Sequence, residues 1–131
     1  VDLTRVKIDH CNDTTDIESL KWILDQGCYL GLDRYPGRLV SPHMRTLTMK
    51  RLIDEGYEDR LCPSHDCICL AVVKENPDGT MPEEHEFARH NHHGFLYIKR
   101  EVIPDLKEMG VSDETVNALF VENPKRFFRG D

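Results

Sequence analysis

The sequence predicts an α/β fold with parallel strands, and two observations support that prediction. Short strand patterns alternate with helical patterns over residues 5–64, in the order strand, helix, strand, helix, strand. The run CYLGL at residues 28–32 is also largely apolar, which is typical of a strand covered on both faces of a sheet. Short connections between alternating elements indicate parallel strands joined by right-handed crossovers.

Composition limits the classes of function. The chain of 131 residues has the usual size of one domain, and its 39% hydrophobic and 31% charged content fits a globular protein. A net charge of -7 argues against general nucleic-acid binding, which usually needs a basic face. The sequence shows neither a membrane-length apolar run nor the apolar core of a signal peptide. We therefore expect a cytoplasmic protein with no nucleic-acid or membrane partner.

The first strand and helix are predicted from residues 5–27. Residues 5–9 (RVKID) alternate between polar and apolar side chains and indicate a short strand. Thr15 and Glu18 have the spacing of a capping box, which predicts a helix start. One face of this helix would carry three apolar side chains, Ile17, Leu20 and Leu24. Gly27 supplies a plausible helix stop.

The second half of the predicted sheet repeats this arrangement. After the strand at residues 28–32, Ser41 and Pro42 have the residue types of a helix cap and first helical position. We expect this helix to end at Gly56 and to be followed by a strand at residues 60–64. The candidates for its buried side are Met44, Leu47, Leu52 and Ile53.

Residues 66–94 differ from the rest of the chain because they form a long polar connection. Four histidines lie in it, His85, His90, His92 and His93. A loop of this length in a compact domain is more often functional or mobile than inert. A helix is expected over residues 95–109, with an interruption at Pro104, and a last helix from Ser112 to the residue before Pro124.

Five cysteines argue for free thiols, since the count is odd and no secretory signal is present. Cys28 and Cys62 lie in predicted strands and are expected in the core. A structural metal site is the alternative, although the C-x-x-C spacing is missing. That alternative would draw on Cys62, Cys67, Cys69, His90, His92 and His93.

Each predicted strand ends in titratable residues. They are His10 and Asp13 after the first strand, Asp33 and Arg34 after the second, and His65 and Asp66 after the third. Ligands and catalytic groups gather at the carboxyl ends of parallel strands, because the following loops lie on the same side. Imidazole and carboxylate groups together suit a divalent metal such as zinc, which activates a bound water. These residues are therefore a candidate metal site.

Four segments carry a resemblance to a known family. They are IDHCNDTTD, GLDRY, RLCPSHD and GVSDETVNALFVENPKRFF, in this order along nearly the whole chain. Together they resemble the C-terminal part of the phosphotriesterase-related amidohydrolases. The resemblance implies a TIM-type (β/α)₈ barrel with two metal ions at its carboxyl face, of which residues 1–131 would form strands six to eight and their helices as a single partial domain.

The resemblance also implies roles for individual residues. His10 would be a metal ligand, and Asp66 would bind the second metal and its bridging hydroxide. Asp13 corresponds to the family's proton-relay carboxylate. Residues near the substrate would be Asp33, Arg34 and Tyr35. Because GLDRY looks more like the phosphotriesterase-like lactonases, lactones or related esters are the expected substrates.

A complete site would need more than this chain. The family's first-strand H-x-H pair, its bridging lysine and its fifth-strand histidine have no counterpart in the sequence. A barrel of this type needs about 250 residues. We therefore expect a missing N-terminal barrel portion, or a homo-oligomer, to complete a binuclear zinc hydrolase. The alternative is a metal-binding or scaffold fragment without catalysis of its own.

Overall fold

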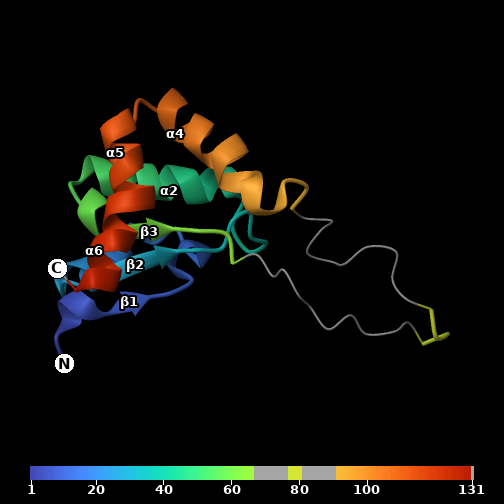
Figure 1. The fold of residues 1–131 in the computed structure, drawn as a ribbon, viewed down its shortest axis with the longest axis horizontal. Helices are drawn as coiled ribbons and strands as arrows, with labels where there is room; N and C mark the ends of the chain where they lie inside the picture. Colours follow the sequence, from blue (N-terminus) through green and yellow to red (C-terminus); the bar gives the residue numbers. More distant parts are fainter. Residues whose placement is uncertain (67–76, 81–90, 131) are drawn as a thin grey trace.

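Three short parallel strands form one open sheet in the computed structural model, which describes residues 1–66, 77–80 and 91–130. The strands follow chain order, β1 (Lys7–Ile8), β2 (Tyr29–Leu32) and β3 (Leu61–Pro63). This confirms the predicted α/β fold with parallel strands. The strands point away from the end of the molecule at which both termini lie (Figure 1).

Helices connect and follow the strands. The described residues include the α-helices α1 (Ile17–Asp25), α2 (Pro42–Asp54), α4 (Ile103–Glu108), α5 (Asp113–Asn117) and α6 (Asn123–Arg129). Short 3₁₀ turns lie at η1 (Leu3–Arg5), η2 (Cys11–Asp13), η3 (Glu58–Arg60) and η4 (Gly94–Leu96). Two π-helical turns are η5 (Ile98–Val102) and η6 (Ala118–Glu122). Figure 1 shows α2, α4 and α5 on one side of the sheet, with α6 running back toward the termini.

The start of α1 differs from the predicted capping box. Asp16, not Thr15, is the N-cap, and its Oδ1 accepts a hydrogen bond from the Ser19 N–H at 3.4 Å. The Ser19 hydroxyl also donates to Asp16 Oδ2 at 2.5 Å. The prediction was wrong because the aspartate one position later offers a carboxylate, which accepts from both groups of Ser19. The predicted buried face is confirmed at Ile17, Leu20 and Leu24.

The buried side of α2 is also only partly as predicted. Its cap is confirmed, since Ser41 Oγ accepts from the Met44 N–H at 3.3 Å. Met44 itself is 41% exposed, so its predicted burial was wrong, whereas Leu52 is fully buried. The buried positions of α2 are Arg45, Thr46, Thr48, Met49 and Leu52. The helix therefore turns a mixed polar and apolar face inward.

Prolines do not end the C-terminal helices. Pro104 and Pro124 each lie in the first turn of an α-helix that directly follows a π-helical turn. A proline is tolerated there because its missing N–H would have little use in the first turn. The prediction of a helix that stops before Pro124 was therefore wrong, and helical structure continues to Arg129.

The two faces of the sheet have different surroundings. Leu30, Leu32 and Leu61 belong to the hydrophobic core, which the helices complete. Other core residues include Leu20, Leu24, Met49, Leu52, Val102, Leu106 and Leu119.

The burial predicted for Cys28 and Cys62 is confirmed. In the part of the chain that the structure describes, no helix combines the length and apolar character needed to cross a membrane.

Polar side chains lie over Gly31 in β2. A Cβ atom on Gly31 would lie 2.5 Å from Asp9 Oδ1 and 2.9 Å from Lys7 Nζ. Near the start of β2, Tyr29 is 2% exposed and its ring packs edge-on against Phe127 of α6, with centroids 5.3 Å apart. All four residues of β2 are consequently buried, as its apolar sequence predicts.

Candidate active site

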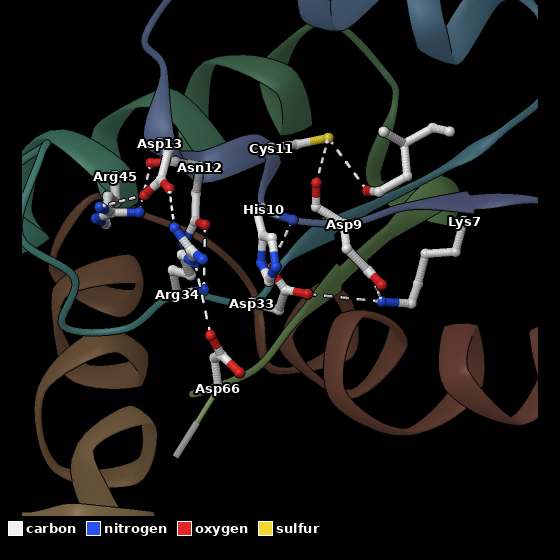
Figure 2. Close-up of polar contacts among 11 residues, drawn as sticks. Lys7, Asp9, His10, Cys11, Asn12, Asp13, Asp33, Arg34, Arg45 and Asp66 are labelled. Carbon is white, nitrogen blue, oxygen red and sulfur yellow. Dashed lines mark hydrogen bonds and ion pairs between the residues drawn. The ribbon is translucent and has the colours of Figure 1, made fainter. Parts of the chain in front are cut away.

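The polar residues that follow the three strands are collected at one edge of the sheet (Figure 2). His10 follows β1, Asp33 follows β2 and Asp66 lies beyond the end of β3. His10 and Asp66 have the left-handed φ values 61° and 49°, which residues other than glycine seldom adopt. Such conformations turn the chain sharply where each strand ends.

Asp33 holds His10 in place. Its Oδ1 accepts a hydrogen bond from the His10 main-chain N–H at 2.8 Å and lies 3.1 Å from His10 Nδ1. A carboxylate can only accept, so Nδ1 carries the proton in this contact, and a neutral ring would then have its lone pair on Nε2. Asp33 is 8% exposed, whereas the His10 side chain is 47% exposed. An imidazole oriented by a carboxylate with its other nitrogen outward is the usual arrangement of a metal-binding histidine.

Lys7 lies on the other side of Asp33. Its Nζ is 3.8 Å from Asp33 Oδ2 and forms a close ion pair with Asp9. Although burial acts to lower it, hydrogen bonding to Asp9 raises the pKa of Lys7. The ammonium therefore stays charged and partly balances two carboxylates, Asp9 after β1 and Asp33 after β2.

Arg34 connects the ends of all three strands. Its main-chain N–H donates to Asn12 Oδ1 at 3.1 Å, and its Nη1 donates to Asp13 Oδ2 at 2.6 Å. Its Nε lies 3.5 Å from Asp66 Oδ2, so a second carboxylate neighbours the same guanidinium. The Arg34 side chain is 40% exposed. It therefore presents a fixed positive charge at the carboxyl ends of the strands, where His10, Asp33 and Asp66 lie (Figure 2). We call this side of the sheet the open edge.

Asp13 is bound by two arginines. Arg45 Nη2 donates to its Oδ1 at 2.8 Å, while Arg34 occupies its Oδ2. Although burial acts to raise it, the hydrogen bonds from Arg45 and Arg34 hold the pKa of Asp13 below its usual value. Hydrogen bonding to Asp13 likewise raises the pKa of Arg34. Near neutral pH this group is therefore a carboxylate fixed between two cations.

Tyr35 lies apart from the other predicted site residues. Its side chain is 1% exposed and belongs to the hydrophobic core, and burial raises the pKa of its hydroxyl. The structure thus gives Tyr35 a core environment, whereas the sequence predicts a contact with substrate. The predicted contact of Tyr35 with substrate therefore stays a prediction.

His65 and Asp66 contact different parts of the molecule. His65 Nε2 accepts a hydrogen bond from the Ile98 N–H at 3.2 Å, and its ring packs edge-on against Phe95. Asp66 instead neighbours Arg34 and is 50% exposed. His65 thus ties the end of β3 to the C-terminal helices, while Asp66 remains at the open edge.

The donors for a metal ion are incomplete in residues 1–66, 77–80 and 91–130. No group of three or more histidine, cysteine, aspartate or glutamate side chains is close enough there to hold a metal. His10 and Asp66 have donor atoms of suitable chemistry and are about half-exposed, so the residues present fit part of a site. In the alternative site, burial raises the pKa of Cys62 to about 11, which disfavours the thiolate that binds zinc. Of its other members, Cys67, Cys69 and His90 lie outside the described residues, as does His85, whereas His92 and His93 are described.

Comparison with known proteins identifies the family. The sequence profile of the Phosphotriesterase family matches residues 1–128. The chain belongs to this family. An aryldialkylphosphatase of Saccharolobus solfataricus is 37% identical over 129 residues, a match that covers 98% of this chain and 40% of that protein.

Two solved structures are similar in fold. The phosphotriesterase from Mycobacterium tuberculosis has a TM-score of 0.82 at 36% identity, covering 98% of this chain and 38% of that one. A structure described as organophosphate hydrolysis engineered from a weak promiscuous lactonase template also has a TM-score of 0.82, at 29% identity, covering 98% and 40%. The chain thus spans about two fifths of the length of these relatives.

Three polar residues of this region were not predicted from the sequence. They are Lys7, Asn12 and Arg45, which contact Asp33, Arg34 and Asp13. Lys7 and Asn12 lie near predicted strand-end residues, but polar residues there are ordinarily solvated. Arg45 had a detectable signal, since Arg45, Met49 and Leu52 have the i, i+4, i+7 spacing of one helix face.

Proposed function

We propose that this chain supplies part of the active site of a metal-dependent hydrolase that acts on lactones or related esters. In this proposal the chain forms strands six to eight of a (β/α)₈ barrel. An N-terminal barrel portion or further copies of the chain would provide the remaining strands. The observation that carries the proposal is the edge of the sheet at which Asp33 orients His10 and Arg34 lies between Asp13 and Asp66.

The proposed metal ligands are His10 and Asp66. His10 presents its Nε2 because Asp33 occupies the Nδ1 side, and Asp66 is a half-exposed carboxylate at the same edge. A divalent metal, which we propose to be zinc, supplies Lewis-acid activation of the carbonyl and of water when bound. Since two donors do not complete a zinc site, the remaining ligands would come from the rest of the barrel.

Arg34 is the proposed substrate-orienting residue. Its guanidinium is held by Asp13 but remains partly exposed, so it has N–H groups available for a carbonyl or carboxylate oxygen. Asp33 contributes by holding His10 close to this position. The lactonase template among the similar structures supports ester substrates, while the aryldialkylphosphatase supports phosphotriesters as secondary substrates.

Asp66 and Asp13 have different proposed roles in proton transfer. Asp66 neighbours the open edge and can orient the attacking nucleophile and accept its proton. Asp13 corresponds to a relay carboxylate by resemblance, but in this chain its partners are two arginines, which do not give up their protons near neutral pH. The geometry therefore favours a role for Asp13 in holding Arg34.

The proposal is tested on the full-length protein that carries this segment. Its metal content and its hydrolysis of a γ-lactone and of a dialkyl aryl phosphate are measured before and after chelation. We expect lactone turnover to be lost on chelation, restored by zinc, and strongly reduced by His10→Asn. His43→Asn is the control, because His43 is an exposed histidine on α2 with a 67% exposed side chain. Lactone turnover that survives both chelation and His10→Asn would contradict the proposal.

A further inference from the structure

Arg45 is an arginine buried inside the fold. It lies in α2 with a side chain that is 0% exposed. Its Nε donates to the Val40 carbonyl oxygen at 2.9 Å, its Nη1 to the Asn12 carbonyl oxygen at 2.6 Å and its Nη2 to Asp13 Oδ1 at 2.8 Å. A buried charge is tolerated only when it is paired and hydrogen-bonded, and all three nitrogens of this guanidinium have such partners.

The loop after β2 leaves room for this guanidinium. Gly37 has φ +70°, and a Cβ atom at this position would overlap the Nε, Cζ and Nη2 atoms of Arg45. The left-handed conformation and the close approach both require glycine. The loop containing Gly37 and the helix that follows it, α2, are therefore shaped around one orientation of the Arg45 side chain.

Asp13 transmits that orientation to the edge of the sheet. One oxygen of its carboxylate accepts from Arg45 and the other accepts from Arg34, so the plane of the carboxylate is fixed from the buried side. Arg34 in turn lies against Asp66. The four side chains form a continuous line of alternating charge, Arg45, Asp13, Arg34 and Asp66, from the interior to the open edge (Figure 2).

We propose that Arg45 is a positioning residue, which fixes the Asp13 carboxylate and thereby sets where the Arg34 guanidinium lies beside Asp66. Arg45 cannot touch a substrate, because its side chain is fully buried. The consequence for substrate orientation rests on the function proposed above for Arg34. The positioning itself is a property of the folded chain and can be measured without a substrate or a metal.

The test uses nuclear magnetic resonance of the ¹⁵N-labelled 131-residue chain. The Nε–H of Arg34 lies beside Asp66, so its resonance, assigned with Arg34→Lys, reports where the guanidinium lies relative to that carboxylate. Arg45→Lys retains the charge but loses the fork of donors, and Gly37→Ala displaces the guanidinium without removing it. In each variant we expect the Arg34 resonance to move toward that of a solvent-exposed arginine and to exchange faster with water.

A control resonance separates this effect from general loosening of the fold. Arg126 lies on α6, away from the carboxyl ends of the strands, and its Nη2 donates to Asp59 Oδ1 at 2.8 Å. The Nε–H resonance of Arg126 should stay unchanged in both variants. An unchanged Arg34 resonance in a folded variant overturns the proposal. If neither variant folds, the proposal is tested on the wild-type chain by following the ¹³C resonance of the Asp13 carboxylate as the pH is changed. A midpoint below the usual aspartate value supports the two-arginine clamp, and a midpoint at or above that value overturns it.

Discussion

Asp33 Oδ1 contacts His10 twice, accepting from its main-chain N–H at 2.8 Å and lying 3.1 Å from its Nδ1. The contact joins the ends of β1 and β2, two neighbouring parallel strands. It holds the left-handed turn at His10 and engages the Nδ1 side of the ring. The proposed metal ligand His10 is therefore oriented by contacts within this chain.

Replacing Arg34 is predicted to change substrate preference. In the full-length protein, Arg34→His should lower lactone kcat/KM by roughly 10-fold to 100-fold, because a misplaced or missing orienting group costs about that much. Phosphotriester turnover should fall less or rise, so the ratio of the two rates moves toward phosphotriesters. The measurement is kcat/KM for a γ-lactone and a dialkyl aryl phosphate with wild type and variant.

The competing explanation for Arg34 is a purely structural ion pair. Asp33 is adjacent to Arg34 in the sequence, but the guanidinium contacts Asp13 and Asp66. Arg34→Lys keeps the charge and is the matched control for loss of the planar donor group. If the lactone to phosphotriester ratio is the same in wild type and Arg34→His, the structural explanation is preferred.

The strand-end residues could be predicted from sequence because topology alone brings them together. Alternating strands and helices imply parallel strands, and parallel strands place His10, Asp33 and Asp66 at one edge whatever the side chains do. The contacts of Arg45 could not be predicted in the same way. They depend on the side-chain direction of one helix residue and on the space left at Gly37. The burial of Tyr35 could not be predicted from topology either, because Arg34 is partly exposed whereas the next residue, Tyr35, lies in the core.

Two thiols are predicted to make the chain less stable at high pH. Burial raises the pKa of both Cys11 and Cys62 to about 11, above the ordinary value of 9.0. In the folded chain both thiols hold their protons longer than in the unfolded chain, so their contribution to stability is complete below the ordinary value. It is lost as the pH rises from about 9 toward 11. The free energy of unfolding, measured across this range, should fall less steeply in Cys62→Ala than in wild type.

Alkylation provides a second measurement on the same thiols. Only the thiolate reacts, so Cys11 and Cys62 should react slowly in the folded chain and at an ordinary rate once it is unfolded. Peptide mapping after a short exposure to iodoacetamide separates the individual cysteines. Rapid modification of Cys62 in the folded chain near neutral pH would contradict the buried, protonated state.

Asn123 is predicted to be important for stability. It is fully buried, and its Nδ2 donates to the carbonyl oxygens of Glu58 at 2.6 Å and Leu61 at 2.8 Å. Asn123→Ala leaves these acceptors without their donor, which should cost about 1–3 kcal/mol of unfolding free energy. Asn117→Ala, at an exposed position on α5, is the matched control and should change stability little. Equal melting temperatures for the two variants would show that the Asn123 hydrogen bonds do not hold α6 against the start of β3.

The last prediction separates Asp66 from its neighbour His65. Asp66 is half-exposed beside Arg34, whereas His65 accepts a hydrogen bond from the Ile98 N–H at 3.2 Å and contacts Phe95. Asp66→Asn keeps the shape of the side chain but removes the charge needed to hold a metal and to accept a proton. In the full-length protein, turnover should therefore fall by roughly 10²-fold to 10⁴-fold, the usual contribution of positioned proton transfer.

Metal content and melting temperature distinguish the two variants. Metal content should fall in Asp66→Asn while its melting temperature changes little, because an open-edge residue contributes little to core packing. His65→Asn should show the opposite pattern, with lower stability from the lost contacts to the C-terminal helices and a smaller loss of turnover. Near-normal turnover of Asp66→Asn, or a larger loss in His65→Asn, would mean that the mechanism depends on the wrong residue of this pair.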